Sequence, residues 1–263
     1  MSIFTTAHAP ASGGDATPQQ ALRLHEVTKR FEEAGAPVLD RVDLTVAPGE
    51  FVCLLGASGC GKSTLLSLVA GLDQPTAGSI EHVGKPALMF QEPALFPWLT
   101  AAENVELALR LSGMPKEQRG SRARELLSLV HLDRAIDQRP HELSGGMRQR
   151  VALARALAQD STILLMDEPF AALDAVTRDV LHEELVRIWQ ETGLSIIFVT
   201  HNVREAARLG QRVILMSSRP GRIAREWRVD IPQPRRIEAE AVSRLAGEIT
   251  EELRKEIRSH AQR

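Results

Sequence analysis

The chain has 263 residues, of which 43% are hydrophobic and 25% charged, with a formal net charge of −2. This composition is ordinary for a soluble globular protein with a sizeable core, and the balanced charge gives no electrostatic case for wholesale nucleic-acid binding. The two cysteines, Cys53 and Cys60, show no metal-ligand spacing and are interpreted as a small buried hydrophobe and a loop residue in a reducing compartment. Neither a membrane span nor a signal peptide is predicted, so any association with a membrane must pass through another chain.

The first 20 residues are rich in Ala, Ser, Gly, Pro and Thr and are expected to be disordered. Residues 22–27 and 42–46 then alternate apolar with polar, which predicts half-exposed antiparallel strands. Phe31 follows the first of them. Its ring would either stack on an adenine or serve as a core residue or strand-end plug, and the sequence leaves both open.

A glycine-rich loop follows an apolar strand over 50–55 and precedes a helix over 65–70. It reads Gly56-Ala57-Ser58-Gly59-Cys60-Gly61-Lys62-Ser63-Thr64. Strand, glycine loop and helix are the context in which such a loop binds phosphate, because its N–H groups and the helix N-terminus attract an anion. Lys62 would reach the outer phosphates, and the Ser63 hydroxyl would bind Mg²⁺. The alternative is an ordinary turn before a helix.

The next segments predict a helical lobe. A short apolar run over 87–90 ends at Gln91, and residues 92–99 carry two prolines and two aromatic residues, as either a buried connector or a docking surface. Thr100 and Glu103 form a capping box that opens a helix to Gly113. A second helix is predicted over 116–132.

Leu143-Ser144-Gly145-Gly146 predicts another helix N-terminus that faces an anion. Ser144 is a good N-cap, and the glycine pair leaves backbone N–H groups uncovered. An ordinary capped helix is the alternative. Because this helix start has no strand of its own, it suggests contact with a nucleotide that is held elsewhere.

An acidic pair follows the continuous apolar run over 162–166, which predicts a parallel strand covered on both faces. At the end of such a strand, Asp167 would hold Mg²⁺ and Glu168 would orient and deprotonate the attacking water. Two solvated acids are the alternative. The apolar run over 194–200 delivers His201 to the same sheet edge, which favours a functional histidine over a capping or core one.

A long helix from Asp174 to Gly193 is predicted between these strands. Its apolar side is expected to contain Val180, Leu181, Leu185, Ile188 and Trp189. A short helix over 202–209, a strand over 213–216 and a returning hairpin strand over 222–231 follow. The arginines of this region are interpreted as a solvated basic edge rather than a nucleic-acid surface, since they lack interleaved aromatic residues.

The last segment, about 238–260, is amphipathic and is expected to pack on the domain or on a partner copy. Its apolar stripe is Leu245, Ile249, Leu253 and Ile257. Glu240 with Arg244 and Glu251 with Lys255 have the spacing of i,i+4 ion pairs.

In their order along the chain, the phosphate loop, Gln91, Leu143 to Gly146, Asp167-Glu168, Asp174 and His201 closely resemble the nucleotide-binding subunit of ATP-binding cassette (ABC) transporters. The resemblance covers Leu22 to Ile231. It implies an α/β fold of the P-loop NTPase class, with a mainly parallel RecA-like core sheet, an N-terminal antiparallel β subdomain and an inserted α-helical subdomain over about 97–157. The expected organisation is a disordered tail over 1–20, a nucleotide-binding domain over 21–232 and a helical tail over 233–263.

The resemblance also implies roles for individual residues. ATP and Mg²⁺ would be the cofactors, with the loop from Gly56 to Thr64 as Walker A, Ser63, Gln91 and Asp167 at the metal, and Phe31 against the adenine. The catalytic residues would be Glu168 as general base, His201 at the γ-phosphate, Lys62 and Gln91. Asp174 would be the D-loop acid, and Ser144, Gly145 and Gly146 would contact ATP bound by a second copy in a head-to-tail dimer.

Finer motifs resemble the importer subgroup for nitrate, sulfonates and taurine. They are Phe90 to Leu95, Pro97 to Thr100, Asp167 to Asp174 and Ser218 to Arg222, while Val229 to Arg236 looks most like aliphatic-sulfonate importers. Ala171 departs from the glycine common there. The implied protein is an ATPase at the cytoplasmic face of the membrane, bound to two permease subunits, served by a solute-binding protein and not bound to nucleic acid. A non-transport ABC ATPase and a non-hydrolysing regulatory subunit are the alternatives.

Overall fold

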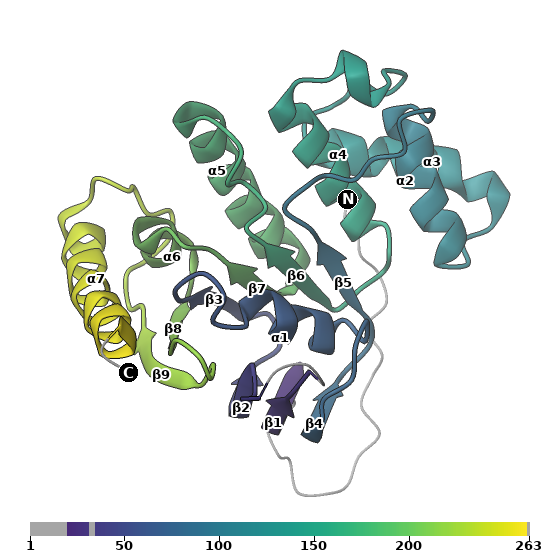
Figure 1. Ribbon diagram of the computed structural model, residues 1–263. Helices are drawn as coiled ribbons and strands as arrows, with labels where there is room; N and C mark the ends of the chain where they lie inside the picture. Colours follow the sequence, from purple (N-terminus) through teal and green to yellow (C-terminus); the bar gives the residue numbers. More distant parts are fainter. Residues whose placement is uncertain (1–19, 32–34, 262–263) are drawn as a thin grey trace, which may run out of the picture.

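A computed structural model describes residues 20–31 and 35–261 (Figure 1). The strands are β1 (Leu22–Lys29), β2 (Leu39–Val46), β3 (Phe51–Leu55), β4 (Ala77–His82), β5 (Pro86–Met89), β6 (Ile163–Asp167), β7 (Ser195–Val199), β8 (Arg212–Met216) and β9 (Ile223–Arg228). The helices are α1 (Lys62–Val69), α2 (Ala101–Leu111), α3 (Lys116–Leu129), the 3-10 helix η1 (Pro140–Glu142), α4 (Gly145–Leu157), α5 (Ala175–Thr192), α6 (Val203–Leu209) and α7 (Glu240–Ala261). The expectation of disorder over 1–20 falls, except for Gln20, outside the described residues.

The central sheet has six strands in the order β5-β6-β7-β3-β8-β9, and all are parallel except β9, which returns antiparallel to β8. A separate three-stranded antiparallel sheet has the order β2-β1-β4. The structure therefore confirms the predicted α/β fold with a mainly parallel sheet and an N-terminal antiparallel sheet. The strand order places β7 between β3 and β6, which decides the arrangement of the site.

Both faces of the central sheet are buried, which explains the uninterrupted apolar runs of its strands. In β3, Phe51, Cys53 and Leu55 face a core shared with α2 to α6, whereas Val52 and Leu54 face a second core shared with α1 and the antiparallel sheet. Phe51 forms an edge-to-face contact with Trp189 of α5, at 5.7 Å between ring centroids. The whole of β3 is thus fixed from two sides just before the glycine loop.

Gly78 of β4 lies against an irregular part of β1, where the pairing register shifts between His25 and Thr28. Its φ angle is +86°, and an added Cβ would lie 2.4 Å from the Glu26 carbonyl oxygen. We expect Gly78→Ala to lower the free energy of unfolding by more than about 2 kcal/mol, because backbone strain and a steric clash add together. Urea unfolding of the purified chain measures this loss.

Gly71 supplies the matched control for that experiment. It also has a positive φ, +71°, but an added Cβ would meet nothing within 4 Å. Gly71→Ala should therefore lose only about 1 kcal/mol, the cost of the backbone conformation alone. Equal losses for the two variants would show that the contact with β1 is not tight.

The predicted helical lobe consists of α2, α3, η1 and α4 (Figure 1). The predicted capping box is present, since the Thr100 side chain accepts from the Glu103 backbone and the Glu103 carboxylate accepts from the Thr100 N–H. The predicted second helix is shorter than expected and ends at Leu129. Within the described residues, no helix combines the length and apolarity needed to cross a bilayer.

The two long C-terminal helices differ from the sequence interpretation in detail. Val180 is 46% exposed, so it does not belong to the buried side of α5, which does include the other four predicted residues. Ile257 at the end of the α7 stripe is also 46% exposed, whereas Ile249 is fully buried. Near the end of α7, Lys255 pairs with Glu252 at 2.6 Å rather than with the predicted Glu251.

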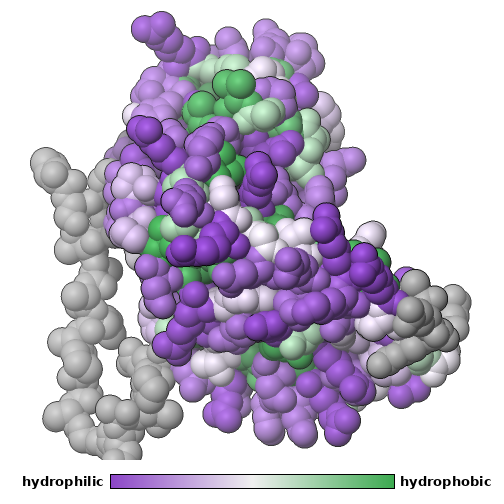
Figure 2. Space-filling view, turned by 90° about the vertical axis from the view of Figure 1, so that its left-hand side faces the viewer, coloured by the Kyte–Doolittle hydropathy of each residue, from purple (hydrophilic) through white to green (hydrophobic). Residues whose placement is uncertain are grey.

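Helix α7 packs on α6, with Val242 and Ala246 against Ala207. The packing on the domain that the sequence left as one of two possibilities is therefore observed. Figure 2 shows this side of the molecule as mainly hydrophilic, with small, separate hydrophobic areas. Along the apolar stripe of α7, Ile249 is buried and Leu245 and Leu253 are half-buried, so most of the stripe is turned inward.

Candidate functional site

The phosphate loop connects the end of β3 to the start of α1, as the sequence predicts. Gly61, the residue before α1, has φ +101°, and an added Cβ would lie 2.7 Å from Leu39. Only glycine fits this turn without strain. Because Gly61 is the N-cap of α1, the turn also brings the loop directly into the helix N-terminus. No acidic residue lies in the first turn of α1, which leaves the helix dipole free to attract an anion.

Lys62 lies within the curve of this loop. Its side chain is buried, at 6% exposure of the residue, and its Nζ donates to the carbonyl oxygens of Gly56, at 2.9 Å, and Ala57, at 3.1 Å. These carbonyl groups are neutral, so they leave the charge of the buried ammonium unneutralised. The loop therefore combines a cation and a helix N-terminus in one place, which suits a bound phosphate chain.

Glu168 and His201 meet at the carboxyl edge of the central sheet. The His201 Nδ1 and a Glu168 carboxylate oxygen are 2.8 Å apart. Two backbone bonds set this position, from the Glu168 N–H to the Val199 carbonyl at 3.0 Å and from the Thr200 N–H to the Leu54 carbonyl at 3.1 Å. The turn that carries His201 is thereby tied on one side to β6 and on the other to β3, beside the phosphate loop.

This pair is accessible to a ligand. The His201 side chain is 67% exposed and that of Glu168 is 25% exposed. Glu168 has φ +45°, an unfavourable conformation for a residue with a side chain, and it follows Asp167, the last residue of β6. A carboxylate on a strained backbone at the sheet edge, in contact with a histidine, is suited to positioning a water molecule for attack.

Gln91 lies just after β5, at the junction with the helical lobe. Its side chain is exposed, and its carbonyl accepts from the Gln149 side chain of α4 at 2.8 Å. Gln149 is itself buried, at 2% exposure. The position of Gln91 is consequently coupled to the helix that begins at Ser144.

Ser144 caps α4, and its hydroxyl accepts from the Met147 N–H at 3.3 Å. Ser144 is exposed, while Gly146 packs against Thr177 of α5. Figure 1 draws α1 and α4 well apart, and in the described part of the chain Ser144 forms no hydrogen bond with the phosphate loop. The structure thus does not bring this predicted anion site to the phosphate loop of the same molecule.

Asp174 and Phe31 are the two remaining predicted site residues. Asp174 caps α5, and the hydrogen bond from the Thr177 N–H, at 3.0 Å, holds the pKa of its carboxyl below the usual value. Phe31 is 44% exposed, with the Lys29 ammonium 5.0 Å from the ring centroid. This exposure excludes a core position for Phe31.

The structure adds a contact that no sequence pattern predicts. Arg219, in the loop between β8 and β9, donates from Nε to the Gly59 carbonyl at 3.2 Å. Cys60, expected in the loop, is buried and lies 3.7 Å from the Lys62 ammonium. A hollow of about 240 Å³ lies here, lined by residues 57–60, Ser218, Arg219 and Ile257.

Comparison with known proteins also points to a nucleotide-binding protein. The family model described as ABC transporter matches residues 39–171. The nitrate import ATP-binding protein NrtD of Synechocystis is 48% identical over 202 residues, covering 74% of this chain and 76% of that protein. The taurine import ATP-binding protein TauB of Mesorhizobium japonicum is 46% identical over 214 residues, covering 78% and 83%.

Solved structures of ATP-binding cassettes and of an ABC transporter resemble this chain. A dimeric ATP-binding cassette in a post-hydrolysis state, bound to ADP and Pi, is 35% identical with a TM-score of 0.71, and the match covers 80% of this chain and all of that one. An inward-facing putative metal-chelate type ABC transporter is 24% identical with a TM-score of 0.72, covering 80% of this chain and 84% of that one. The second likeness supports the fold alone.

Proposed function

Because this chain belongs to the ABC transporter family, whose ATPases hydrolyse ATP, we propose that it is the energy-coupling ATPase subunit of an importer for a small solute. The observation that carries the proposal is the Glu168–His201 contact at the sheet edge beside the phosphate loop. A non-hydrolysing regulatory subunit would not need this solvent-accessible pair or the strained backbone of Glu168.

The proposed roles follow from the positions of the residues. Backbone N–H groups from Gly56 to Thr64 and the Lys62 ammonium bind the phosphates of ATP, and Phe31 stacks on the adenine. Glu168 orients the attacking water and accepts its proton, while His201 donates to the γ-phosphate as charge builds up. The rate gain comes from positioning and charge stabilisation rather than from a covalent intermediate.

The donor set also suits Mg²⁺. The exposed Ser63 hydroxyl stands in the first turn of α1, and Asp167 ends β6, so a hydroxyl, a carboxylate and the Gln91 amide oxygen are the proposed ligands. Oxygen donors of this kind are those that Mg²⁺ prefers alongside phosphate oxygens. The ion would neutralise charge on the β- and γ-phosphates.

The proposed active form is a head-to-tail dimer. Ser144, Gly145 and Gly146 of one copy contact ATP on the phosphate loop of the other, and Asp174 lies at the same contact. The separation of Ser144 from the phosphate loop of its own chain supports this arrangement, since an exposed helix N-terminus suited to an anion then gains its ligand from the partner. Dimeric forms of a related cassette also support it.

The aromatic connector, residues 90–98, is proposed as the docking surface for a permease subunit. Trp98 is 65% exposed and Phe90 is 49% exposed. The backbone beneath them is fixed, because Arg155 donates to the carbonyl oxygens of Pro93, at 2.6 Å, and Ala94, at 2.7 Å. Large apolar side chains held rigidly in solvent mark an interaction surface.

Trp98→Glu tests this surface. Coexpressed with its two permease subunits, the variant should lose copurification with the membrane fraction by about tenfold or more, since a buried charge would replace a hydrophobic anchor. The ATP turnover of the isolated chain should not change. Leu111→Glu, which alters an 80% exposed residue of the helical lobe, is the control and should copurify normally.

ATP turnover of the same complex tests which solute is transported. Nitrate and taurine are the solutes in the names of two relatives, and taurine is itself a sulfonate, so we propose a sulfonate with nitrate as the alternative. Turnover should rise when the cognate solute-binding protein is added with taurine or another sulfonate, and nitrate should then have no effect. A wild-type chain that stayed out of the membrane fraction with its permease present would instead support a non-transport ATPase.

A further inference from the structure

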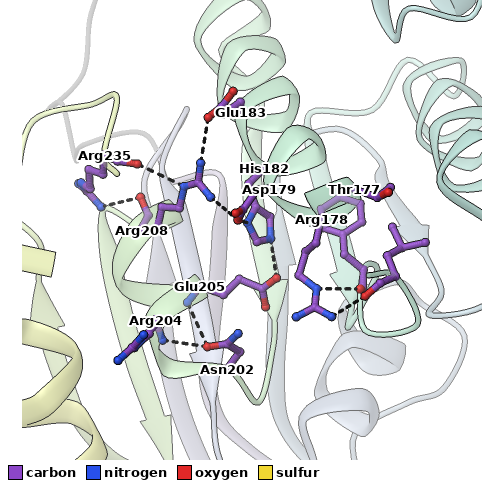
Figure 3. A network of polar contacts seen from close by, with 12 residues as sticks. Thr177, Arg178, Asp179, His182, Glu183, Asn202, Arg204, Glu205, Arg208 and Arg235 are labelled. Carbon is purple, nitrogen blue, oxygen red and sulfur yellow. Dashed lines mark hydrogen bonds and ion pairs between the residues drawn. The ribbon is translucent and has the colours of Figure 1, made fainter. Parts of the chain in front are cut away.

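A buried pair of side chains lies behind the Glu168–His201 contact. His182 of α5 is 1% exposed, and the side chain of Glu205 in α6 is 7% exposed. The His182 Nε2 donates to a Glu205 carboxylate oxygen at 2.5 Å. Figure 3 shows the two side chains pointing toward one another between the helices, inside a larger polar network.

Glu205 holds both neighbours of His201. Its second carboxylate oxygen accepts from the Thr200 hydroxyl, and its backbone N–H donates to the Asn202 side chain at 3.4 Å. The Asn202 N–H in turn donates to the Thr200 hydroxyl oxygen at 3.0 Å. These bonds close the turn around His201, so the position of its backbone depends on Glu205.

His182 extends the support to the loop that carries Glu168. Its ring packs against Phe170, with centroids 5.7 Å apart, and Phe170 is 1% exposed. Phe170 comes two residues after Glu168, and its carbonyl accepts from Arg178 of α5 at 3.3 Å. His182 therefore contacts the Glu168 loop directly, by packing on Phe170, and the His201 turn indirectly, through Glu205.

A carboxylate this deeply buried is unfavourable unless its donors stay in place. Glu205 has two side-chain donors, His182 and Thr200, one to each carboxylate oxygen, and loss of either would leave one buried oxygen without its donor. The pair is therefore a stiff element, because any movement of α6 relative to α5 breaks a buried hydrogen bond. Stiffness here fixes the distance between the two loops of the site.

We propose that His182 and Glu205 are positioning residues that hold Glu168 and His201 in the mutual geometry needed for ATP hydrolysis. The inference rests on the proposed function, since it assigns a role in that reaction. Within the described residues, neither side chain forms a hydrogen bond with the phosphate loop. Their effect is therefore expected on the chemical step rather than on nucleotide binding.

His182→Phe is the first test. It keeps an aromatic ring against Phe170 but removes the donor to Glu205. We expect kcat to fall about 10- to 100-fold with KM for ATP changed less than about threefold, since a small misplacement of catalytic groups costs this much. His182→Gln, which restores an N–H donor of similar reach, should recover most of kcat.

Trp189→Phe supplies a matched control on the same helix. Trp189 is also buried, and its indole donates to the Gly49 carbonyl at 2.9 Å, at the opposite end of α5 from the site. This variant loses one hydrogen bond of a buried aromatic residue and should cost a similar amount of thermal stability. Its kcat should stay within about twofold of wild type.

A double-mutant cycle with His201→Ala separates positioning from general damage. If His182 acts through His201, His182→Phe should lower single-turnover hydrolysis much less in the His201→Ala background than in wild type. Glu205→Gln, which keeps the shape of the side chain, enters the same cycle and gives the answer should His182→Phe fail to fold.

The outcomes separate this inference from the function on which it rests. A wild-type chain without ATP turnover would overturn the proposed function. A wild-type chain with turnover, but with a His182→Phe loss that equals that of Trp189→Phe, would overturn the inference alone. Equal losses in the two His201 backgrounds, or no rescue by His182→Gln, would do the same.

Discussion

Glu168→Gln is expected to lower kcat for ATP hydrolysis by about 10²- to 10⁴-fold while leaving ATP binding intact. The amide keeps the size of the side chain and a contact to His201, which lies 2.8 Å from the carboxylate, but it cannot accept a proton from water. Because ATP then persists, the variant should also accumulate as an ATP-bound dimer. Phosphate release under saturating ATP and sedimentation with nucleotide measure the two effects.

Glu191→Gln is the control for this experiment. Glu191 also pairs with a basic residue, Arg187 at 3.0 Å, but on the exposed surface of α5 away from the site. Its loss should change kcat by less than about twofold, because exposed ion pairs contribute little. If wild type in the assembled complex hydrolysed ATP no faster than Glu168→Gln, the protein would be a non-hydrolysing subunit.

Mixing two inactive variants should restore activity if the nucleotide site is shared between copies. Lys62→Ala removes the ammonium group proposed to bind phosphate, and Ser144→Arg blocks the N-terminus of α4. Each homodimer of either variant therefore has two defective sites. In a mixed dimer both defects fall in one site and the other site is intact. Random mixing should then recover about a quarter of wild-type turnover, because half of the dimers are mixed and each keeps one of two sites.

Lys62→Ala mixed with Glu168→Gln is the matching control. Both residues belong to the same half of the site, so a mixed dimer has one defect in each of its two sites and recovers nothing. Recovery in this control would show exchange or contamination. An absence of recovery with Ser144→Arg, at concentrations where mixed dimers are demonstrated by crosslinking, would contradict the head-to-tail arrangement.

Much of this protein could be predicted from short stretches of sequence. The phosphate loop, the capping box at Thr100 and the apolar strands depend on interactions within a few residues, and these patterns are visible in order along the chain. The predictions were wrong where the burial or pairing of a helix residue depends on neighbouring segments, which a helix pattern does not show. Val180 is apolar yet exposed, and Lys255 pairs with Glu252 instead of Glu251.

The sequence by itself determined which groups are available for chemistry: a lysine in a glycine loop, acids at a strand end and a histidine after the next strand. Only the tertiary structure decided how they meet. Strand β7 had to pair with β6 before Glu168 and His201 could touch, and α5 had to pack on α6 before His182 could reach Glu205. Those contacts join residues 33 and 23 positions apart, so they follow from the order of the strands and the burial of helices rather than from any local pattern.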